Sequence, residues 1–133
     1  MNYRLGKNED LQNIKKLTNK LRNELGFVMN VVLSEAIKHD ELYVCELNDN
    51  IIGFIHFHKR IDGWNTIHEI AVDANYQRCG IGEKLFNMIS KPRKLKTTID
   101  NIKANNFYKK QNMLNIGIEQ GRKRKLNIWI DKK

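Results

Sequence analysis

The segment from Ile67 to Gly82 constrains the fold of this chain more than any other part of the sequence. Apolar residues that end at Val72 predict a strand, and a helical pattern of apolar residues begins immediately after Gly80. Only the loop from Asp73 to Cys79 separates the two elements. A strand that leads through so short a loop into a helix indicates a sheet with helices packed on it, an α/β protein.

The loop has the chemistry of an anion site. The first amides of a helix have no carbonyl partner within the helix, and the helix dipole favours negative charge at the same place. Gly80 and Gly82 would let a phosphate or pyrophosphate approach the backbone, and Arg78 and Lys84 add positive charge nearby. The third glycine of a dinucleotide fingerprint and the Gly-Lys-Ser/Thr ending of a P-loop are both missing. On these residues alone, an ordinary strand–turn–helix connection with capping glycines is an equal alternative.

The whole sequence predicts a single domain over residues 1–133, with the element order β-α-α-β-β-β-α-β-α-β-β. Periodicity predicts helices over 8–25, from 28 to about 38, from 80 toward Pro92, and over 102–111. Strands are predicted over 3–5, 42–47, 51–60, 64–72, 95–99, 114–120 and 125–130. Because this order mixes hairpins with a helical crossover, we expect a mixed sheet with helices on both faces.

Two motifs carry a family resemblance. The run Gln77 to Gly82 (Q-R-C-G-I-G) resembles the Q/R-x-x-G-x-G/A loop of the GNAT superfamily of N-acetyltransferases at every fixed position. The run Asn101 to Lys110 is similar to the family's N-x-x-A-x-x-F-Y-x-K segment, although Asn105 and Asn106 precede the Phe-Tyr pair here. After Lys110 the family usually has Gly and an aromatic residue, whereas this chain has Gln-Asn-Met.

The resemblance covers nearly the whole chain, because the order of elements is also that of the family. It implies a GNAT-like fold of mixed α/β (α+β) class. The central sheet would be mixed and mostly antiparallel, with about seven strands and about four helices on its two faces.

The resemblance also implies an acetyl-CoA-dependent N-acetyltransferase that transfers the acetyl group directly from CoA to a primary amine. The loop amides would hold the pyrophosphate, and main-chain groups at the end of the preceding strand would pair with the pantetheine arm and polarise the thioester carbonyl. Acetyl-CoA is then a co-substrate, and no metal is expected. The predicted cofactor-binding residues are Ile70, Ala71, Val72, Gln77, Arg78, Cys79, Gly80, Ile81, Gly82, Lys84, Asn101, Asn106 and Tyr108.

Two residues are the candidates for catalysis. Glu69 could make the amine neutral, directly or through a water, and it should face away from the side on which Ile70 and Val72 pack. A solvated or ion-paired carboxylate is an equal alternative. The resemblance implies that Tyr108 reprotonates the departing thiolate, as a phenol of pKa about 10 is protonated at neutral pH. Its alternative role is packing.

The histidines are weaker candidates. His56 and His58 share one face of their strand, so either could approach the acceptor pocket, although strand histidines are more often packing residues. His68 is in phase with Ile70 and is expected to be structural.

The net charge of +9 leaves a second class of function open, a nucleic-acid-binding module on the same fold. The basic runs Arg122–Lys125 and Lys91–Lys96 motivate this alternative. Against it, only Trp129 lies nearby as a stacking aromatic. A GNAT-like protein that binds acyl-CoA without catalysis is a third alternative.

Cys45 and Cys79 are too few for a disulfide scaffold and lack metal-ligand spacing.

The acceptor is open between a protein amine and a small-molecule amine. Glu35, Asp40 and Glu41 could hold a polyamine but are not clustered in the sequence. No apolar run reaches the length of a membrane span, and no secretory segment is recognised. We therefore expect a cytoplasmic protein, as a monomer or a homodimer.

Overall fold

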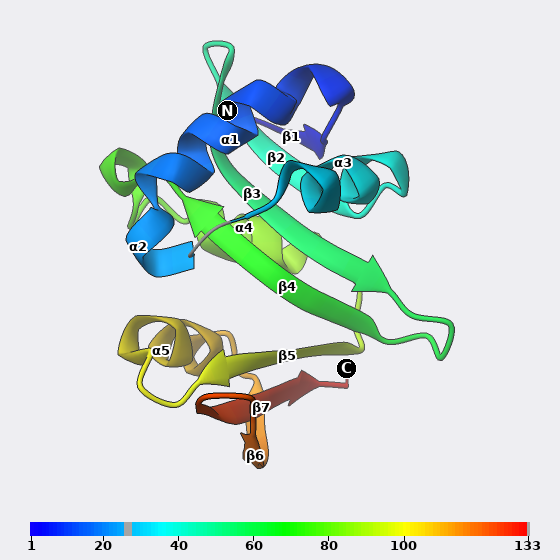
Figure 1. Ribbon diagram of the computed structural model, residues 1–133, viewed down its shortest axis with the longest axis vertical. Coiled ribbons are helices and arrows are strands. Elements are labelled where there is room, and N and C mark those ends of the chain that lie inside the picture. Colours follow the sequence, from blue (N-terminus) through cyan, green and yellow to red (C-terminus); the bar gives the residue numbers. More distant parts are fainter. Residues whose placement is uncertain (26–27, 133) are drawn as a thin grey trace. The chain divides into compact units, whose positions relative to one another are not determined.

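The computed structural model describes residues 1–25 and 28–132, without the side chains of residues 23 and 24. Its strands form one seven-stranded sheet in the order β1-β2-β3-β4-β5-β7-β6 (Figure 1). The pairings of β1 with β2, β2 with β3, β5 with β7 and β6 with β7 are antiparallel. The pairing of β4 with β5 is parallel and joins Asn65 to Arg93 and Thr66 to Lys94. The elements are β1 (Asn2–Leu5), η1 (Asn8–Asp10), α1 (Leu11–Lys20), α2 (Arg22–Leu25), α3 (Asn30–Lys38), β2 (Leu42–Leu47), β3 (Asn50–Lys59), β4 (Asn65–Val72), η2 (Ala74–Tyr76), α4 (Ile81–Asn87), β5 (Arg93–Thr98), α5 (Ile102–Lys110), β6 (Leu114–Gln120) and β7 (Lys125–Asp131).

The predicted order of strands and helices is confirmed, and so is the mixed sheet. Two boundaries differ. The first predicted helix is divided at Leu21, which separates α1 from α2. Helix α4 ends at Asn87, well before Pro92, because the amides of Met88 and Ile89 bond to carbonyls three residues back and tighten the last turn. The predicted interruption at Gly26 lies outside the described residues.

The chain divides into two compact units, which are described separately. Unit 1 comprises Met1–His58 and His68–Ile89, and unit 2 comprises Lys59–Ile67 and Ser90–Lys133. The prediction of one domain over residues 1–133 stays a prediction. No helix in the described part of the chain is long and apolar enough to cross a membrane.

In unit 1, α1 and α3 cover one face of the strands. Their inward residues and those of the strands form one buried cluster, in which Phe54 of β3 and Ala71 of β4 are almost completely enclosed. The other members are Ile14, Leu17, Leu21, Val28, Leu33, Ala36, Ile37, Leu42, Val44 and Ile51. This cluster holds α3 against the strands that lead to the loop after β4.

Helix α4 lies on the opposite face of unit 1, behind the strands in Figure 1. Its residues Ile81 and Leu85 are buried and approach β3 at Gly53. A Cβ on Gly53 would come within 3.1 Å of Ile81 Cγ2, 3.2 Å of Leu85 Cδ1 and 3.2 Å of the Ala71 carbonyl oxygen. The absence of a side chain at this position therefore lets α4 approach the sheet closely.

In unit 2, α5 is joined to the strands by a polar network around Asn105. Its Oδ1 accepts hydrogen bonds from Trp129 Nε1 (3.1 Å) and Asn127 Nδ2 (3.1 Å), and its Nδ2 donates to the Thr98 carbonyl (3.1 Å). A buried ion pair joins Arg93 of β5 to Asp131 of β7 at 2.6 Å. These contacts fix α5 and the end of β7 within the unit.

We expect Gly53→Ala to lower the free energy of unfolding by about 1–3 kcal/mol, because a methyl group must displace Ile81 or Leu85. Replacing a glycine also lowers the conformational entropy of the unfolded chain, which raises the free energy of unfolding by at most about 1 kcal/mol. Chemical denaturation of the variant and the wild type measures the difference. An unchanged or higher stability would show that α4 does not depend on close approach at Gly53.

Candidate active site

The loop after β4 is held by its own hydrogen bonds. The Asp73 amide donates to the Ile52 carbonyl at 2.8 Å, and the Asp73 carboxylate accepts from the Asn75 amide at 3.0 Å. The Gln77 side chain donates from Nε2 to the Val72 carbonyl at 3.2 Å. Because Gln77 is tied back to the end of the strand, the backbone that follows it starts from a fixed position.

The backbone then reverses into α4 through two left-handed residues, Arg78 at φ 67° and Gly80 at φ 79°. The first amides of α4 have no carbonyl partner within the helix. A Cβ placed on Gly80 would meet nothing within 4 Å, so the backbone is open to solvent at this residue. Open space and free amides at a helix start fit the pyrophosphate of a nucleotide-like cofactor.

The predicted side chains of this loop fall into two groups. Arg78 and Cys79 are exposed, so their side chains remain accessible beside the loop. Ile81 is 1% exposed and belongs to the core, so only its main chain is available to a ligand. The Lys84 ammonium lies over the Tyr3 ring, 4.6 Å from the centroid. The cofactor roles of these side chains stay predictions.

The residues at the end of β4 differ in burial. Ala71 is buried in the core cluster, while Ile70 and Val72 are partly exposed. Glu69 is also partly exposed, yet its Oε2 atom is buried and has no hydrogen-bond partner among the described residues. Burial raises the pKa of the Glu69 carboxyl above its ordinary value. A buried carboxylate oxygen without a partner costs stability and is a feature of functional sites.

The predicted residues of α5 belong to unit 2. Asn101 caps the helix, its side chain accepting from the Ala104 amide at 3.2 Å, and Asn106 is exposed. Tyr108 is 5% exposed, and burial raises the pKa of its phenol, which is therefore protonated at neutral pH. The Phe107 ring packs against it edge to face at 5.2 Å. Sequence reasoning missed the bonding role of Asn105, since either residue of the Asn-Asn pair could have faced the strands.

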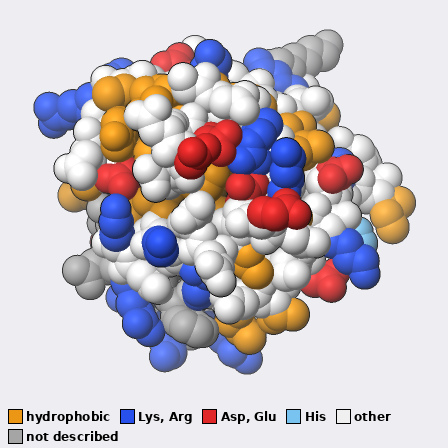
Figure 2. Space-filling view, turned by 90° about the horizontal axis from the view of Figure 1, so that it is seen from above, with side chains coloured by type: hydrophobic (Ala, Val, Ile, Leu, Met, Phe, Trp, Pro, Cys, Tyr) orange, Lys and Arg blue, Asp and Glu red, His pale blue; other side chains and the backbone are white. Residues whose placement is uncertain are grey.

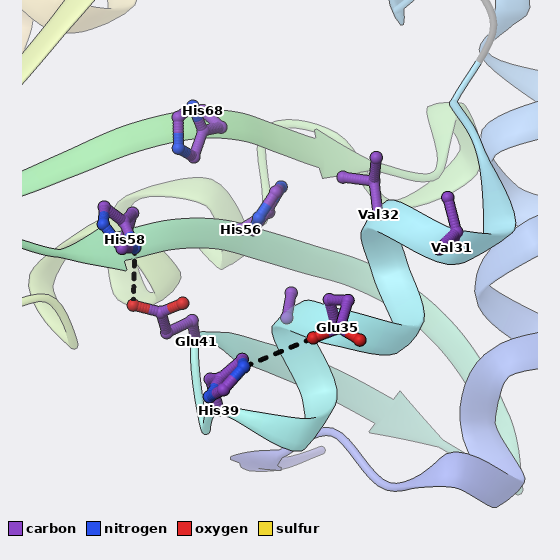
Figure 3. A pocket seen from close by; sticks show the side chains of 9 residues that line it. Val31, Val32, Glu35, His39, Glu41, His56, His58 and His68 are labelled. Atoms are coloured by element: carbon purple, nitrogen blue, oxygen red, sulfur yellow. Dashed lines mark hydrogen bonds and ion pairs between the residues drawn. The ribbon is translucent and has the colours of Figure 1, made fainter.

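Unit 1 also contains a pocket of about 310 Å³ between α3 and strands β3 and β4 (Figure 3). All four histidines of the chain line it, although they come from three different places in the sequence. We call it the four-histidine pocket. Its lining residues are Val31, Val32, Glu35, Ala36, His39, Glu41, His56, His58 and His68.

The polar groups of this pocket are arranged in pairs. His58 Nδ1 lies 3.0 Å from Glu41 Oε2, and His39 Nε2 lies 3.3 Å from Glu35 Oε2 (Figure 3). The rings of His56 and His68 face each other from β3 and β4, with their centroids 4.9 Å apart. No three His, Cys, Asp or Glu side chains in the described part of the chain are grouped so as to hold a metal ion.

His56 forms the buried part of the pocket wall. It is 9% exposed, and its Nδ1 atom has no hydrogen-bond partner among the described residues. Burial, with a smaller contribution from His68, lowers the pKa of the His56 imidazole from 6.5 to about 4. Burial also lowers the pKa of His68. Both rings are therefore neutral at pH 7.

Two sequence signals bear on this pocket. The alternation His-Phe-His from 56 to 58 placed two of the four histidines on one face, and Glu35 and Glu41 were considered as acidic residues that could hold a polyamine. A structural role was expected for His68, and the sequence did not indicate that its ring faces His56. The sequence alone does not give the pairing of β3 with β4, which brings these rings together.

The basic runs lie in unit 2. Lys91 and Arg93 pair with Asp131, and Lys96 pairs with Glu119. Arg124, at the turn between β6 and β7, lies with its Nη1 atom 3.9 Å from Oδ2 of Asp100. On the face seen in Figure 2, acidic side chains lie among several of the Lys and Arg side chains, and a further group of Lys and Arg side chains gathers at the lower left. Much of the basic run around β5 is thus neutralised locally.

The His56 signal in an NMR titration should remain that of a neutral ring down to about pH 4. Histidine in the unfolded chain takes up its proton near pH 6.5, so between these values the unfolded state binds more protons and stability falls as the pH falls. His56→Gln should reduce this pH dependence of the free energy of unfolding. Titration of His56 between pH 6 and 7 would contradict the burial of its ring.

A model of the acetyltransferase (GNAT) domain family matches residues 38–112, which include the loop after β4 and the whole Asn101–Lys110 motif. No curated protein sequence matches the chain.

Several solved structures share the fold. Ard1 from Thermoplasma volcanium has 16% sequence identity and a TM-score of 0.84, over 98% of this chain and 95% of its own. Arabidopsis thaliana Naa50, in complex with the bisubstrate analogue CoA-Ac-MVNAL, has 23% identity and a TM-score of 0.79, over 99% and 98%. The ribosomal-protein-S18-alanine N-acetyltransferase from Escherichia coli has 16% identity and a TM-score of 0.80, over 97% and 91%.

At these identities the structures support the fold alone, while the family model matches more than half of the 133 residues. The chain belongs to the GNAT acetyltransferase domain family.

Proposed function

We propose that this protein transfers the acetyl group of acetyl-CoA directly to a primary amine. The observation that carries the proposal is the fixed loop from Gln77 to Gly82, with its left-handed turn at Gly80 and the exposed backbone at that residue. The family match includes this loop, and the structurally similar Naa50 was solved with a CoA-containing bisubstrate analogue.

In this proposal the main-chain amides at the start of α4 bind the pyrophosphate, and Arg78 adds a charge beside it. The pantetheine arm then runs back along β4, where main-chain groups of Ile70 to Val72 are its partners. When bound, acetyl-CoA supplies a thioester that a neutral amine can attack. The direction of the arm puts its reactive end toward Glu69 and His68 rather than toward the loop.

Glu69 is the proposed proton acceptor. Its buried Oε2 has no partner among the described residues, and the raised pKa of its carboxyl brings it closer to that of a base useful near neutral pH. It takes the proton that the amine must lose, directly or through a water. Tyr108 is the proposed proton donor to the thiolate of CoA, because its buried phenol is protonated at neutral pH.

Binding of acetyl-CoA tests the cofactor site. We expect Gly80→Glu to weaken binding by about tenfold or more in calorimetry, since a side chain strains the left-handed turn and adds a negative charge where the pyrophosphate would lie. Gly63→Glu is a matched control. Gly63 also has a positive φ, 91°, and open space around its Cβ position, but it lies in the hairpin between β3 and β4.

If wild-type protein does not bind acetyl-CoA, the proposal is wrong. Retention of a labelled oligonucleotide with a steep salt dependence would then favour the nucleic-acid-binding alternative.

Glu69→Gln should lower kcat by about 10²–10⁴-fold and remove the acidic limb of the pH–rate profile, because activity is lost as the pH falls through the raised pKa of this carboxyl. Tyr108→Phe should lower kcat with little change in acetyl-CoA affinity. CoA release with a thiol reagent measures both rates. If neither change lowers turnover of an active preparation, these catalytic assignments are wrong.

A further inference from the structure

We propose that the four-histidine pocket binds a protonated amino group of the acceptor, and that the acceptor is a linear diamine or polyamine that reacts through another of its amino groups. This inference rests on the proposed function and adds the class of acceptor to it.

The charges of the lining favour a cation. Among the nine lining residues there are two carboxylates, Glu35 and Glu41, and no Lys or Arg, in a chain whose net charge is +9. Although the two carboxylates are separated in the sequence, the fold brings both to one pocket. The Glu41 side chain is 12% exposed, so its charge acts where solvent screening is weaker than at the surface.

His56 supplies the second observation. The ring is 9% exposed and lines the pocket, and its Nδ1 atom has no partner among the described residues. With the ring proton on Nε2, Nδ1 accepts a hydrogen bond, and an ammonium group has donors to offer. Leaving such an atom unsatisfied is unfavourable, so a donor that reaches it has a specific place to bind.

The same charges argue that the bound group is not the one that reacts. An amine must lose its proton before it attacks a thioester, whereas nearby carboxylates favour the protonated form. The pocket therefore suits a charged group that stays protonated while a second amino group reacts. Two amino groups on one molecule meet both needs.

The spacing fits a short aliphatic chain. His68 lines the pocket, and Ile70, a proposed partner of the pantetheine arm, follows two residues later on β4. Two residues of a strand span about 6.6 Å. A chain of roughly four methylene groups between two nitrogen atoms covers this distance. Val31 and Val32 of α3 line the pocket across from the rings of β3 and β4 in Figure 3 and offer apolar contact to the methylenes.

The histidines make the test selective. Because all four imidazoles of the chain line this pocket, every histidine side-chain signal in a proton–nitrogen NMR spectrum reports on it. We would titrate the protein without acetyl-CoA with 1,4-diaminobutane, with spermidine and with butylamine, at constant pH and ionic strength. The proposal predicts saturable shifts of the His56 and His68 signals by all three amines, because each offers a protonated amino group. When acetyl-CoA is then added, it predicts acetylation of the diamine and of spermidine but not of butylamine, whose single amino group the pocket holds in its protonated form.

Two variants remove one charge each from the pocket. Glu41→Gln and the exposed Glu35→Gln should each weaken diamine binding by about three- to tenfold. Glu9→Gln removes the same charge from the exposed start of the helical region and should leave binding unchanged. With acetyl-CoA present, Glu35→Gln should raise the KM for the diamine and leave its kcat near that of the wild type.

Several outcomes would overturn the proposal. Histidine signals that do not move at millimolar diamine exclude an ammonium subsite in this pocket. Acetylation of butylamine as fast as that of the diamine excludes the requirement for a second amino group. Preferential shifts by a peptide with a free N-terminus, or by Zn²⁺, would assign the pocket to a peptide or a metal instead. If acetyl-CoA binds and the diamine does not, the acceptor class is wrong while the proposed function stands. If the diamine binds but acetyl-CoA does not, the pocket is not an acceptor site.

Discussion

The close packing of α4 on β3 is the constraint on which the candidate cofactor site depends. Gly53 leaves room for Ile81 and Leu85, and burial of each of these side chains contributes roughly 1.5–3 kcal/mol. Once these two side chains are buried, the position of the first turn of α4 relative to β4 is fixed. Only a short loop with left-handed residues can then join the two, and Gly80 provides the second of these conformations. The loop geometry to which we assign anion binding is thus a consequence of core packing.

Unit 1 carries two sites of opposite electrostatic character. At the start of α4, amides and Arg78 favour an anion, while Glu35 and Glu41 give the four-histidine pocket a preference for cations. Strand β4 contributes to both, with His68 lining the pocket and Val72 leading into the loop. An enzyme that joins an anionic cofactor to an amine needs such a separation, because each substrate is then attracted to its own site.

Local patterns in the sequence predicted most of the fold. The periodicity of α5 and the apolar run of β2 gave these elements nearly the bounds observed, and the Gln77–Gly82 motif predicted the strand–loop–helix connection. The end of α4 at Asn87 was not predicted, because a tighter last turn leaves no mark in apolar spacing. The four-histidine pocket could not be predicted either, since it needs the pairing of β3 with β4 and the position of α3. The burial of Glu69 Oε2 and His56 Nδ1 without a hydrogen-bond partner among the described residues likewise becomes visible only in three dimensions.

The most direct test of the central claim is a map of backbone amide shifts on addition of CoA, measured by NMR. The account predicts the largest changes at the amides of residues 78–83, with further changes at residues 70–72 of β4. Changes confined to the basic turn at residues 122–125, or an absence of changes at saturating CoA, would contradict it.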